Sequence, residues 1–314
     1  MYIYKQYKYP SVILHDFYFN GNYGAKGEKR QPKREFTPEQ IKKHNQRQKE
    51  KEVQLLLLEN FKKGDYWITL TYPKGIGTEI GISQVRDDLS VFIGHLRKVY
   101  RKKGYPLKWM RRIEVGSGGA KHVHLTINRI PDTDIMELTS EYWESKHGHA
   151  DHRSLNNEDP TFAKLAEYMT KPPSEAAVKK LKAIGDSDDI SSIVNYSRSR
   201  NLKKPVPEVR KYTRRKMNRI LDGEIKPTDG YYIDRDRKPP VRGINPYNGM
   251  SYLSYREIRL EKGIEPEPVK FCECPICHQF TLDFVKCDCQ LKKKRNGYKH
   301  LHTKLNKTST TGSS

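Results

Sequence analysis

Two short segments joined by a glycine-rich turn constrain the fold of this chain most. Trp109–Val115 and His122–Ile127 are rich in β-branched and aromatic residues, and Gly116-Ser117-Gly118-Gly119 lies between them. In the second segment, apolar residues alternate with His122 and His124. Because successive side chains of a strand point to opposite faces, the pattern predicts an antiparallel sheet with one buried face. Both imidazoles are then expected on the other, polar face.

The length of the turn predicts which residues face each other across this hairpin. A hairpin centred on Gly118 pairs Glu114 with His122 and Arg112 with His124, with paired Cβ atoms about 5 Å apart. His122, His124 and Glu114 are therefore expected to lie within reach of one divalent ion. Imidazole nitrogens and a carboxylate with open positions suit Mn²⁺ or Mg²⁺. A register slip of one residue would move Glu114 to the opposite face.

A short helix downstream carries a candidate nucleophile. Asp159-Pro160 predicts its start and Pro172 its end. Within it, Tyr168 and Lys171 lie three residues apart and are expected on one flank. A phenol with a pKa near 10 attacks poorly without help, which a divalent ion at the phosphate and the Lys171 ammonium would supply. A metal site and a tyrosine together indicate DNA nicking and rejoining.

The charge of the chain predicts a polyanionic partner. Its 314 residues hold 60 Lys and Arg against 38 Asp and Glu, a formal net charge of +22. No apolar run approaches the length of a membrane span, and the start lacks the apolar stretch of a signal peptide, so we expect a cytoplasmic bacterial protein that binds nucleic acid. The residues expected to contact DNA are Thr69, Thr71, Arg112, Lys164, Arg198, Arg200, Lys203 and Lys204.

The order of the expected elements is β, α, β, β, α, β, α, which predicts an α+β domain over residues 61–175. A basic arm and a helix that begins after Thr37-Pro38 are expected before it, in residues 1–60. After it we expect a basic accessory helical region over 176–265, a cysteine-rich module over 266–300 and a disordered tail over 301–314.

All five cysteines fall between Cys272 and Cys289, which predicts metal binding in a reducing compartment. Cys274 and Cys277 have the spacing of a zinc knuckle. Cys287 and Cys289 offer a second pair, so we expect a small zinc-ribbon-like module that holds a structural Zn²⁺. The second pair is C-x-C rather than C-x-x-C, so Cys272 and His278 stay open as alternative ligands.

Three motifs in order resemble those of the HUH endonuclease superfamily, in the single-tyrosine form of rolling-circle replication initiators from plasmids, phages and integrative elements of Gram-positive bacteria. They are Ile68-Thr69-Leu70-Thr71-Tyr72, His122-Val123-His124 and Tyr168-Met169-Thr170-Lys171. Glu114 corresponds to the acidic third ligand of some viral initiators. Residues 21–30 and 199–205 resemble features of the Firmicute versions.

This resemblance implies a central antiparallel five-stranded sheet with flanking helices. It also implies that Tyr168 attacks a phosphodiester at a single-stranded or hairpin origin, leaving a 5′-phosphotyrosine link and a free 3′-OH. Duplex DNA and a host helicase and polymerase are further expected partners. Three alternatives stay open: a relaxase, a single-tyrosine transposase, and a non-catalytic zinc-containing DNA-binding regulator whose histidines are structural.

Overall fold

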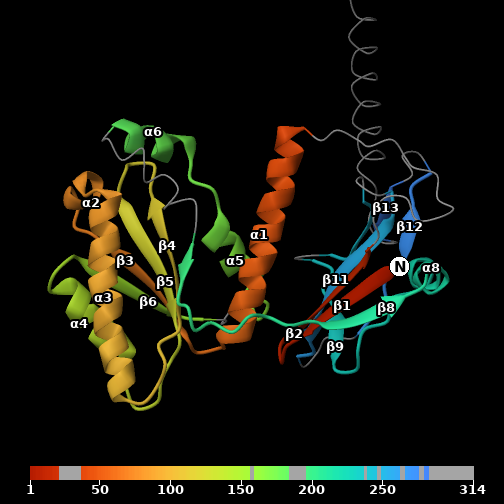
Figure 1. The fold of residues 1–314 in the computed structure, drawn as a ribbon, viewed down its shortest axis with the longest axis horizontal. Helices are drawn as coiled ribbons and strands as arrows, with labels where there is room; N and C mark the ends of the chain where they lie inside the picture. The colour runs from red at the N-terminus through yellow and green to blue at the C-terminus, as the bar shows by residue number, and fades with distance from the viewer. Residues whose placement is uncertain are drawn as a thin grey trace, which may run out of the picture. The chain divides into compact units, whose positions relative to one another are not determined.

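The computed structural model describes residues 1–20, 37–155, 159–183, 196–236, 239–245, 249–261, 266–275 and 279–282. These residues form two compact units. One lies within Phe36–Pro205, and the other combines residues from Met1–Glu35 with residues from Val206–Ser314. The boundaries predicted near residues 60, 175 and 265 differ from this division. The predicted α+β class is confirmed, since both units contain antiparallel sheets and helices (Figure 1).

The unit within Phe36–Pro205, called the hairpin unit below, is built on a five-stranded antiparallel sheet in the order β6-β3-β5-β4-β7. Its elements in chain order are α1 (Pro38–Asn60), β3 (Tyr66–Thr71), α2 (Ile76–Glu79), α3 (Ile82–Lys102), β4 (Trp109–Val115), β5 (Lys121–Ile127), α4 (Ile135–Glu144), β6 (His149–Ser154), α5 (Ala163–Thr170), α6 (Glu175–Ala183) and β7 (Ser197–Arg198).

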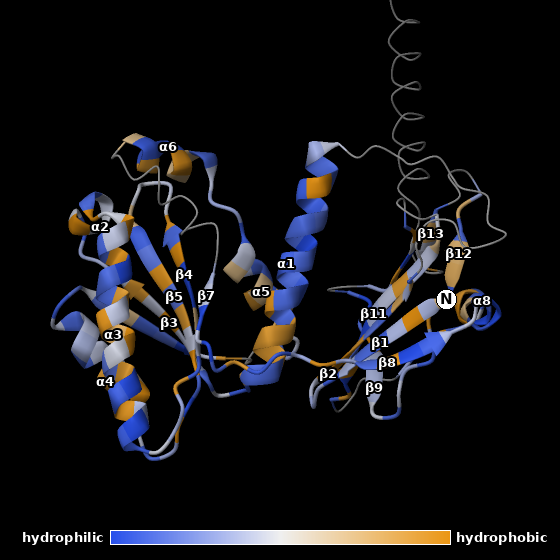
Figure 2. Ribbon diagram, viewed as in Figure 1, coloured by the Kyte–Doolittle hydropathy of each residue, from blue (hydrophilic) through white to orange (hydrophobic). Residues whose placement is uncertain are grey.

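One face of this sheet packs against helices and forms the core. Buried apolar residues of β3, β4 and β5 contact those of α3 and α4, with two residues from α6. In α3 the buried positions recur at helical spacing, as in Val85, Leu89 and Phe92, and Figure 2 shows hydrophobic and hydrophilic residues alternating along it. The opposite face carries polar residues, including both histidines of β5. The core therefore holds one face of the sheet and leaves the other for chemistry.

The other unit, called the tyrosine-rich unit below, has a six-stranded antiparallel sheet in the order β10-β11-β2-β1-β8, with β9 pairing with β11. A separate two-stranded sheet consists of β12 and β13. Its elements are β1 (Tyr2–Lys8), β2 (Val12–Phe19), β8 (Glu208–Tyr212), α8 (Arg214–Asp222), β9 (Tyr231–Ile233), β10 (Val241–Ile244), β11 (Ser251–Arg259), β12 (Phe271–Glu273) and β13 (Phe280–Leu282).

This second sheet corrects two expectations. Residues 176–265 are not a mainly helical region, because strands β8 to β11 occupy much of the described part. The first twenty residues are not part of an arm, since β1 and β2 pair with each other and with β8 and β11. Their partners lie about 200 residues away in sequence, and charged residues within β8 (Glu208, Arg210, Lys211) hide its period of two.

Several expectations concern residues outside the described part of the chain. They include the zinc ligands Cys277, Cys287 and Cys289, the alternative ligand His278, the segment 21–30 and the tail 301–314. Of the described cysteines, Cys272 is exposed in β12 and Cys274 is buried just after it. The structural zinc site stays a prediction. No helix in the described part is long and apolar enough to cross a membrane.

A close backbone approach holds the turn between α4 and β6 against β3. Gly148 has a φ of 147°, and a Cβ atom there would lie 2.3 Å from the carbonyl oxygen of Thr71. We expect Gly148→Ala to lower the free energy of unfolding by about 2 kcal/mol or more, because backbone atoms would have to separate. Thermal unfolding measures the change.

The matched control is Gly94→Ala in α3, where an added Cβ meets nothing within 4 Å. That substitution is expected to raise the free energy of unfolding by up to about 1 kcal/mol, since alanine is the better helix former. If both variants unfold at the same temperature, Gly148 does not make this close contact.

Candidate active site

The hairpin of β4 and β5 has the predicted register. Glu114 pairs with His122, and Arg112 pairs with His124. In the turn, the Gly119 N–H donates to the Gly116 carbonyl at 2.9 Å, and Gly119 has a φ of 92°, which favours glycine. The turn thus fixes the pairing that brings Glu114 and both histidines to the face away from the core.

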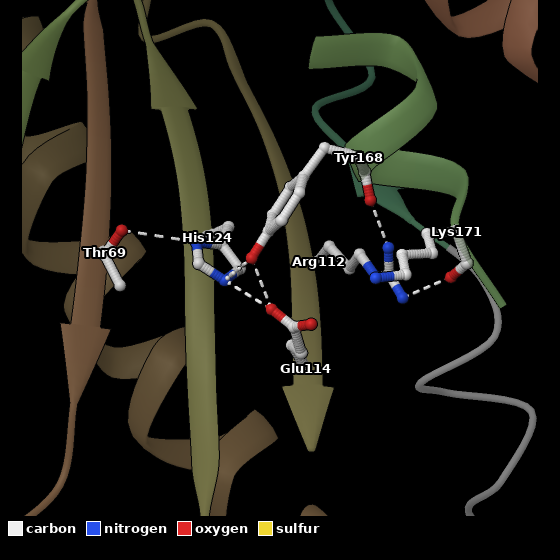
Figure 3. Close-up of polar contacts among 6 residues, drawn as sticks. All are labelled: Thr69, Arg112, Glu114, His124, Tyr168 and Lys171. Atoms are coloured by element: carbon white, nitrogen blue, oxygen red, sulfur yellow. Dashed lines mark hydrogen bonds and ion pairs between the residues drawn. The ribbon is translucent and has the colours of Figure 1, made fainter. Parts of the chain in front are cut away.

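The hydroxyl of Tyr168 reaches this face from α5 (Figure 3). It lies 2.7 Å from Nε2 of His124 and donates a hydrogen bond to the Glu114 carboxylate. His124 Nε2 is also 2.9 Å from the same carboxylate oxygen of Glu114. Three of the predicted site residues therefore form one hydrogen-bonded triangle of phenol, imidazole and carboxylate.

Two residues of β3 hold the imidazole of His124 in place. The Trp67 ring stacks on it with centroids 5.3 Å apart, and also meets the Tyr168 ring edge-on at 5.8 Å. Thr69 Oγ1 lies 3.3 Å from Nδ1 of His124, on the side of the ring opposite Nε2. Thr69 was expected to contact DNA, whereas its contact here orients an imidazole. Thr71 donates to the His149 carbonyl at 3.1 Å.

The electrostatics of the triangle keep the carboxylate charged and the phenol neutral. The hydrogen bond from His124 lowers the pKa of Glu114 to about 2, against a smaller opposing effect of burial. Burial and the hydrogen bond to Glu114 raise the pKa of Tyr168. Burial also lowers the pKa of His122, which favours its neutral, metal-binding form. At neutral pH, the phenol therefore needs a proton acceptor or additional positive charge before it can attack.

Arg112 fastens the helix that carries Tyr168 to the sheet. Its guanidinium donates to the backbone carbonyls of Tyr168 and Lys171, at the end of α5 (Figure 3). Carbonyls in the last turn of a helix lack partners within the helix, so this contact satisfies two of them with a positive charge. Arg112 was expected to contact DNA, but it is only 3% exposed. We therefore assign it a positioning role.

Helix α1 supports α5 from a position far away in the sequence. Gln46 Nε2 donates to the Thr170 carbonyl at 3.0 Å, and Gln54 Nε2 donates to the Thr161 carbonyl at 2.9 Å. The predicted cap is present at the start of α1, where the side chains of Thr37 and Gln40 bind each other's backbone N–H groups. The sequence predicted this helix but showed nothing of its packing against the nucleophile helix.

The three predicted metal ligands are only partly assembled. Glu114 and His124 are in contact, and His122 faces Glu114 across the hairpin, but no three His, Cys, Asp or Glu side chains in the described residues are placed to hold a metal ion. The donors themselves, two imidazoles and an ionised carboxylate, fit a divalent cation such as Mn²⁺. A site of three ligands requires His122 to join the other two.

The remaining candidates for contact with DNA are exposed. Lys164 and Lys171 lie at the two ends of α5, and the backbone of Lys171 is no longer helical. Arg198 and Arg200 line a hollow of about 840 Å³ together with Arg97, Arg101, Tyr105 and Trp109. The backbone of Lys203, next to Lys204, exchanges hydrogen bonds with the Asn60 side chain at 2.8 and 2.9 Å. The hollow joins arginines that are far apart in sequence.

Comparison with known protein families places this site within a matched stretch. Residues 65–173 match the family model of the replication-associated protein ORF2, which is consistent with a rolling-circle replication initiator. The stretch includes His122, His124, Glu114 and Tyr168, and covers less than half of the chain. Comparison with curated proteins and with solved structures gave no significant match. The similarity therefore concerns the hairpin unit and a role in replication.

Replacing Arg112 tests its grip on α5. Lysine keeps the charge but cannot reach two carbonyls with a planar fork, so we expect Arg112→Lys to destabilise the fold by about 2 kcal/mol. Amides in α5 should lose protection in hydrogen exchange measurements. Arg153→Lys is the control, because the side chain of Arg153 on β6 is 77% exposed. Wild-type exchange rates in α5 of the Arg112 variant would contradict the positioning role.

The low pKa of Glu114 predicts how stability depends on pH. Its pKa falls from 4.5 to about 2 on folding, so the ionised carboxylate stabilises the folded chain above pH 4.5 and this contribution is lost as the pH falls towards 2. We expect Glu114→Gln to cost at most about 3 kcal/mol near neutral pH and progressively less in acid. Urea unfolding of the metal-free protein at several pH values measures this difference, and a constant difference would contradict the shift.

Proposed function

We propose that this chain is a replication initiation endonuclease that nicks one DNA strand with Tyr168 as the nucleophile. The observation that carries the proposal is the Tyr168 hydroxyl lying 2.7 Å from His124 and hydrogen-bonded to Glu114. A tyrosine serving only to pack a helix does not need to present its hydroxyl to an imidazole and a carboxylate on a polar sheet face. The family match over the same residues supports a role in replication.

In the proposed reaction, the phenolic oxygen of Tyr168 attacks the phosphorus of a phosphodiester. The new bond joins Tyr168 to the 5′-phosphate of the downstream strand, the bond to the 3′ oxygen breaks, and that oxygen takes up a proton to leave a free 3′-OH. The phenol gives its proton to the hydrogen-bonded carboxylate and imidazole, Glu114 and His124. The phosphotyrosine keeps the energy of the original ester, so that a strand end can later be rejoined without ATP.

The residues around Tyr168 have separate roles in this proposal. Arg112 and α1 hold α5 so that the phenol meets the sheet, and Trp67 and Thr69 fix the imidazole. Lys171 lies at the end of α5, from where its ammonium can offset phosphate charge. A divalent ion bound by His122, His124 and Glu114 would polarise the scissile phosphate as a Lewis acid.

A pool of single-stranded oligonucleotides with random internal sequence tests the reaction without knowledge of the origin. We expect a 3′ label to become covalently attached to the wild-type chain and a 5′ label to be released, as seen on denaturing gels. Tyr168→Phe should reduce the adduct by at least about 100-fold while binding persists. Excess EDTA should suppress the adduct of the wild-type chain.

The matched control is Tyr196→Phe, since Tyr196 is a half-buried tyrosine of the same unit whose hydroxyl lies 3.3 Å from Glu52. Its adduct should equal that of the wild type, and peptide mapping should place the DNA on Tyr168. A non-catalytic regulator would bind the pool and form no adduct. Attachment of the 5′ label instead would overturn the proposed polarity.

A further inference from the structure

The tyrosine-rich unit carries an unassigned hollow whose walls combine aromatic rings with cations. Its volume is about 740 Å³, within the range of about 300–1,000 Å³ typical of ligand sites. The lining includes four aromatic residues on the sheet, Tyr4, Phe17, Tyr212 and Tyr255. Five Lys or Arg side chains and one Glu also line it. All these residues belong to one compact unit, so the hollow is complete within it.

The aromatic residues form a row across neighbouring strands. The Tyr4 ring on β1 stacks on Phe17 of β2 with centroids 4.4 Å apart, and on Tyr212 of β8 at 5.7 Å. On the far side of β2, Tyr255 of β11 stacks on His15 at 4.3 Å. Since β8 ends the strand order of this sheet, Tyr212 ends the row. Tyr4 and Phe17 are 6% exposed, whereas Tyr212 is half-buried and presents part of its ring to the hollow.

The cations come mainly from the helix that covers this face. Met217 and Leu221 pack α8 onto the same aromatic cluster, which leaves Arg215, Lys216 and Arg219 at the rim. All three are exposed. The Lys216 ammonium lies 4.1 Å from the centroid of the Tyr212 ring, so a positive charge already stands beside the end of the aromatic row.

Strand β8 adds a fourth cation and shows that the arrangement belongs to one face. Arg210 pairs with Tyr4 and Tyr212 pairs with Tyr2, so both point to the hollow, where Arg210 also lies 3.3 Å from Glu208. Lys211, between them, belongs to the opposite face. Aromatic rings that continue a stack, within a rim of cations, match a chain of bases joined by phosphates.

We propose that this hollow binds single-stranded DNA, with a base stacked at the Tyr212 end of the aromatic row and phosphates on the cations of α8 and Arg210. A duplex keeps its bases stacked inside and offers the hollow only its backbone, so the aromatic wall favours an unpaired strand. This inference goes beyond the nicking reaction and does not depend on it. It provides the chain with a second hold on DNA, on a unit that lacks Tyr168.

Fluorescence anisotropy of the full-length chain with labelled oligo(dT) tests the proposal. We expect Tyr212→Ala to weaken binding by about 5-fold to 100-fold and Tyr212→Phe to bind like the wild type. Replacing Arg215, Lys216 and Arg219 together by Ala should lower the slope of log affinity against log salt by about 2, at about 0.7 per phosphate contact.

The matched pair Arg210→Glu and Lys211→Glu separates the hollow from general surface charge. The two residues are neighbours on β8 and both are exposed, but only Arg210 lines the hollow. Arg210→Glu should weaken binding at least about 10-fold more than Lys211→Glu, with circular dichroism confirming that both fold. Equal affinities for the pair, or an unchanged affinity of Tyr212→Ala, would overturn the proposal.

Two further arms identify the ligand and keep the proposals separate. Ultraviolet cross-linking of an oligonucleotide that contains 5-iododeoxyuridine should map to Tyr212, whereas tighter binding of a duplex by the same hollow would overturn single-strand recognition. Tyr168→Phe should leave the Tyr212 cross-link intact, and Tyr212→Ala should leave the chemistry of Tyr168 intact at saturating DNA. Failure of one proposal is thus distinguishable from failure of the other.

Discussion

The contact between Arg112 and the end of α5 is the interaction on which the candidate site depends. Arg112 lies on β4 two residues before Glu114, and its guanidinium holds the carbonyls of Tyr168 and Lys171. One strand thus supplies both the carboxylate that meets the phenol and the cation that holds the helix carrying it. Since α5 is short, its orientation depends on such tertiary contacts more than on its own helical propensity.

The site is also a compromise between burial and reactivity. Burying the phenol among Glu114, His124 and Trp67 orients it, but burial raises the pKa of Tyr168 and opposes formation of the phenolate. The same carboxylate that accepts the proton of Tyr168 has a low pKa and is a weak base. The arrangement therefore favours a resting, protonated tyrosine, and its activation depends on what enters the site with the DNA.

Much of the hairpin unit could be predicted because its signals are local. The alternation in His122–Ile127 and the turn ending at Gly119 specify the pairing of Glu114 with His122, and both are read from one short stretch of chain. The tyrosine-rich unit could not be predicted in the same way. Its strands β1 and β2 pair with β8 and β11, and no short-range pattern records such distant partners. The hollow lined by Tyr4 and Arg219 follows from that pairing alone.

The sequence by itself determined the strands, their register and the face that carries His122, His124 and Glu114, because strand periodicity and turn length act between neighbouring residues. It also singled out Tyr168 as the residue to consider. Only the tertiary structure decided that Arg112 binds the end of α5 rather than DNA, that Gln46 and Gln54 of α1 support that helix, and that Glu114 bonds to His124 rather than to its register partner. These outcomes depend on how elements far apart in the chain pack together, and packing of that kind leaves no periodic pattern in the sequence.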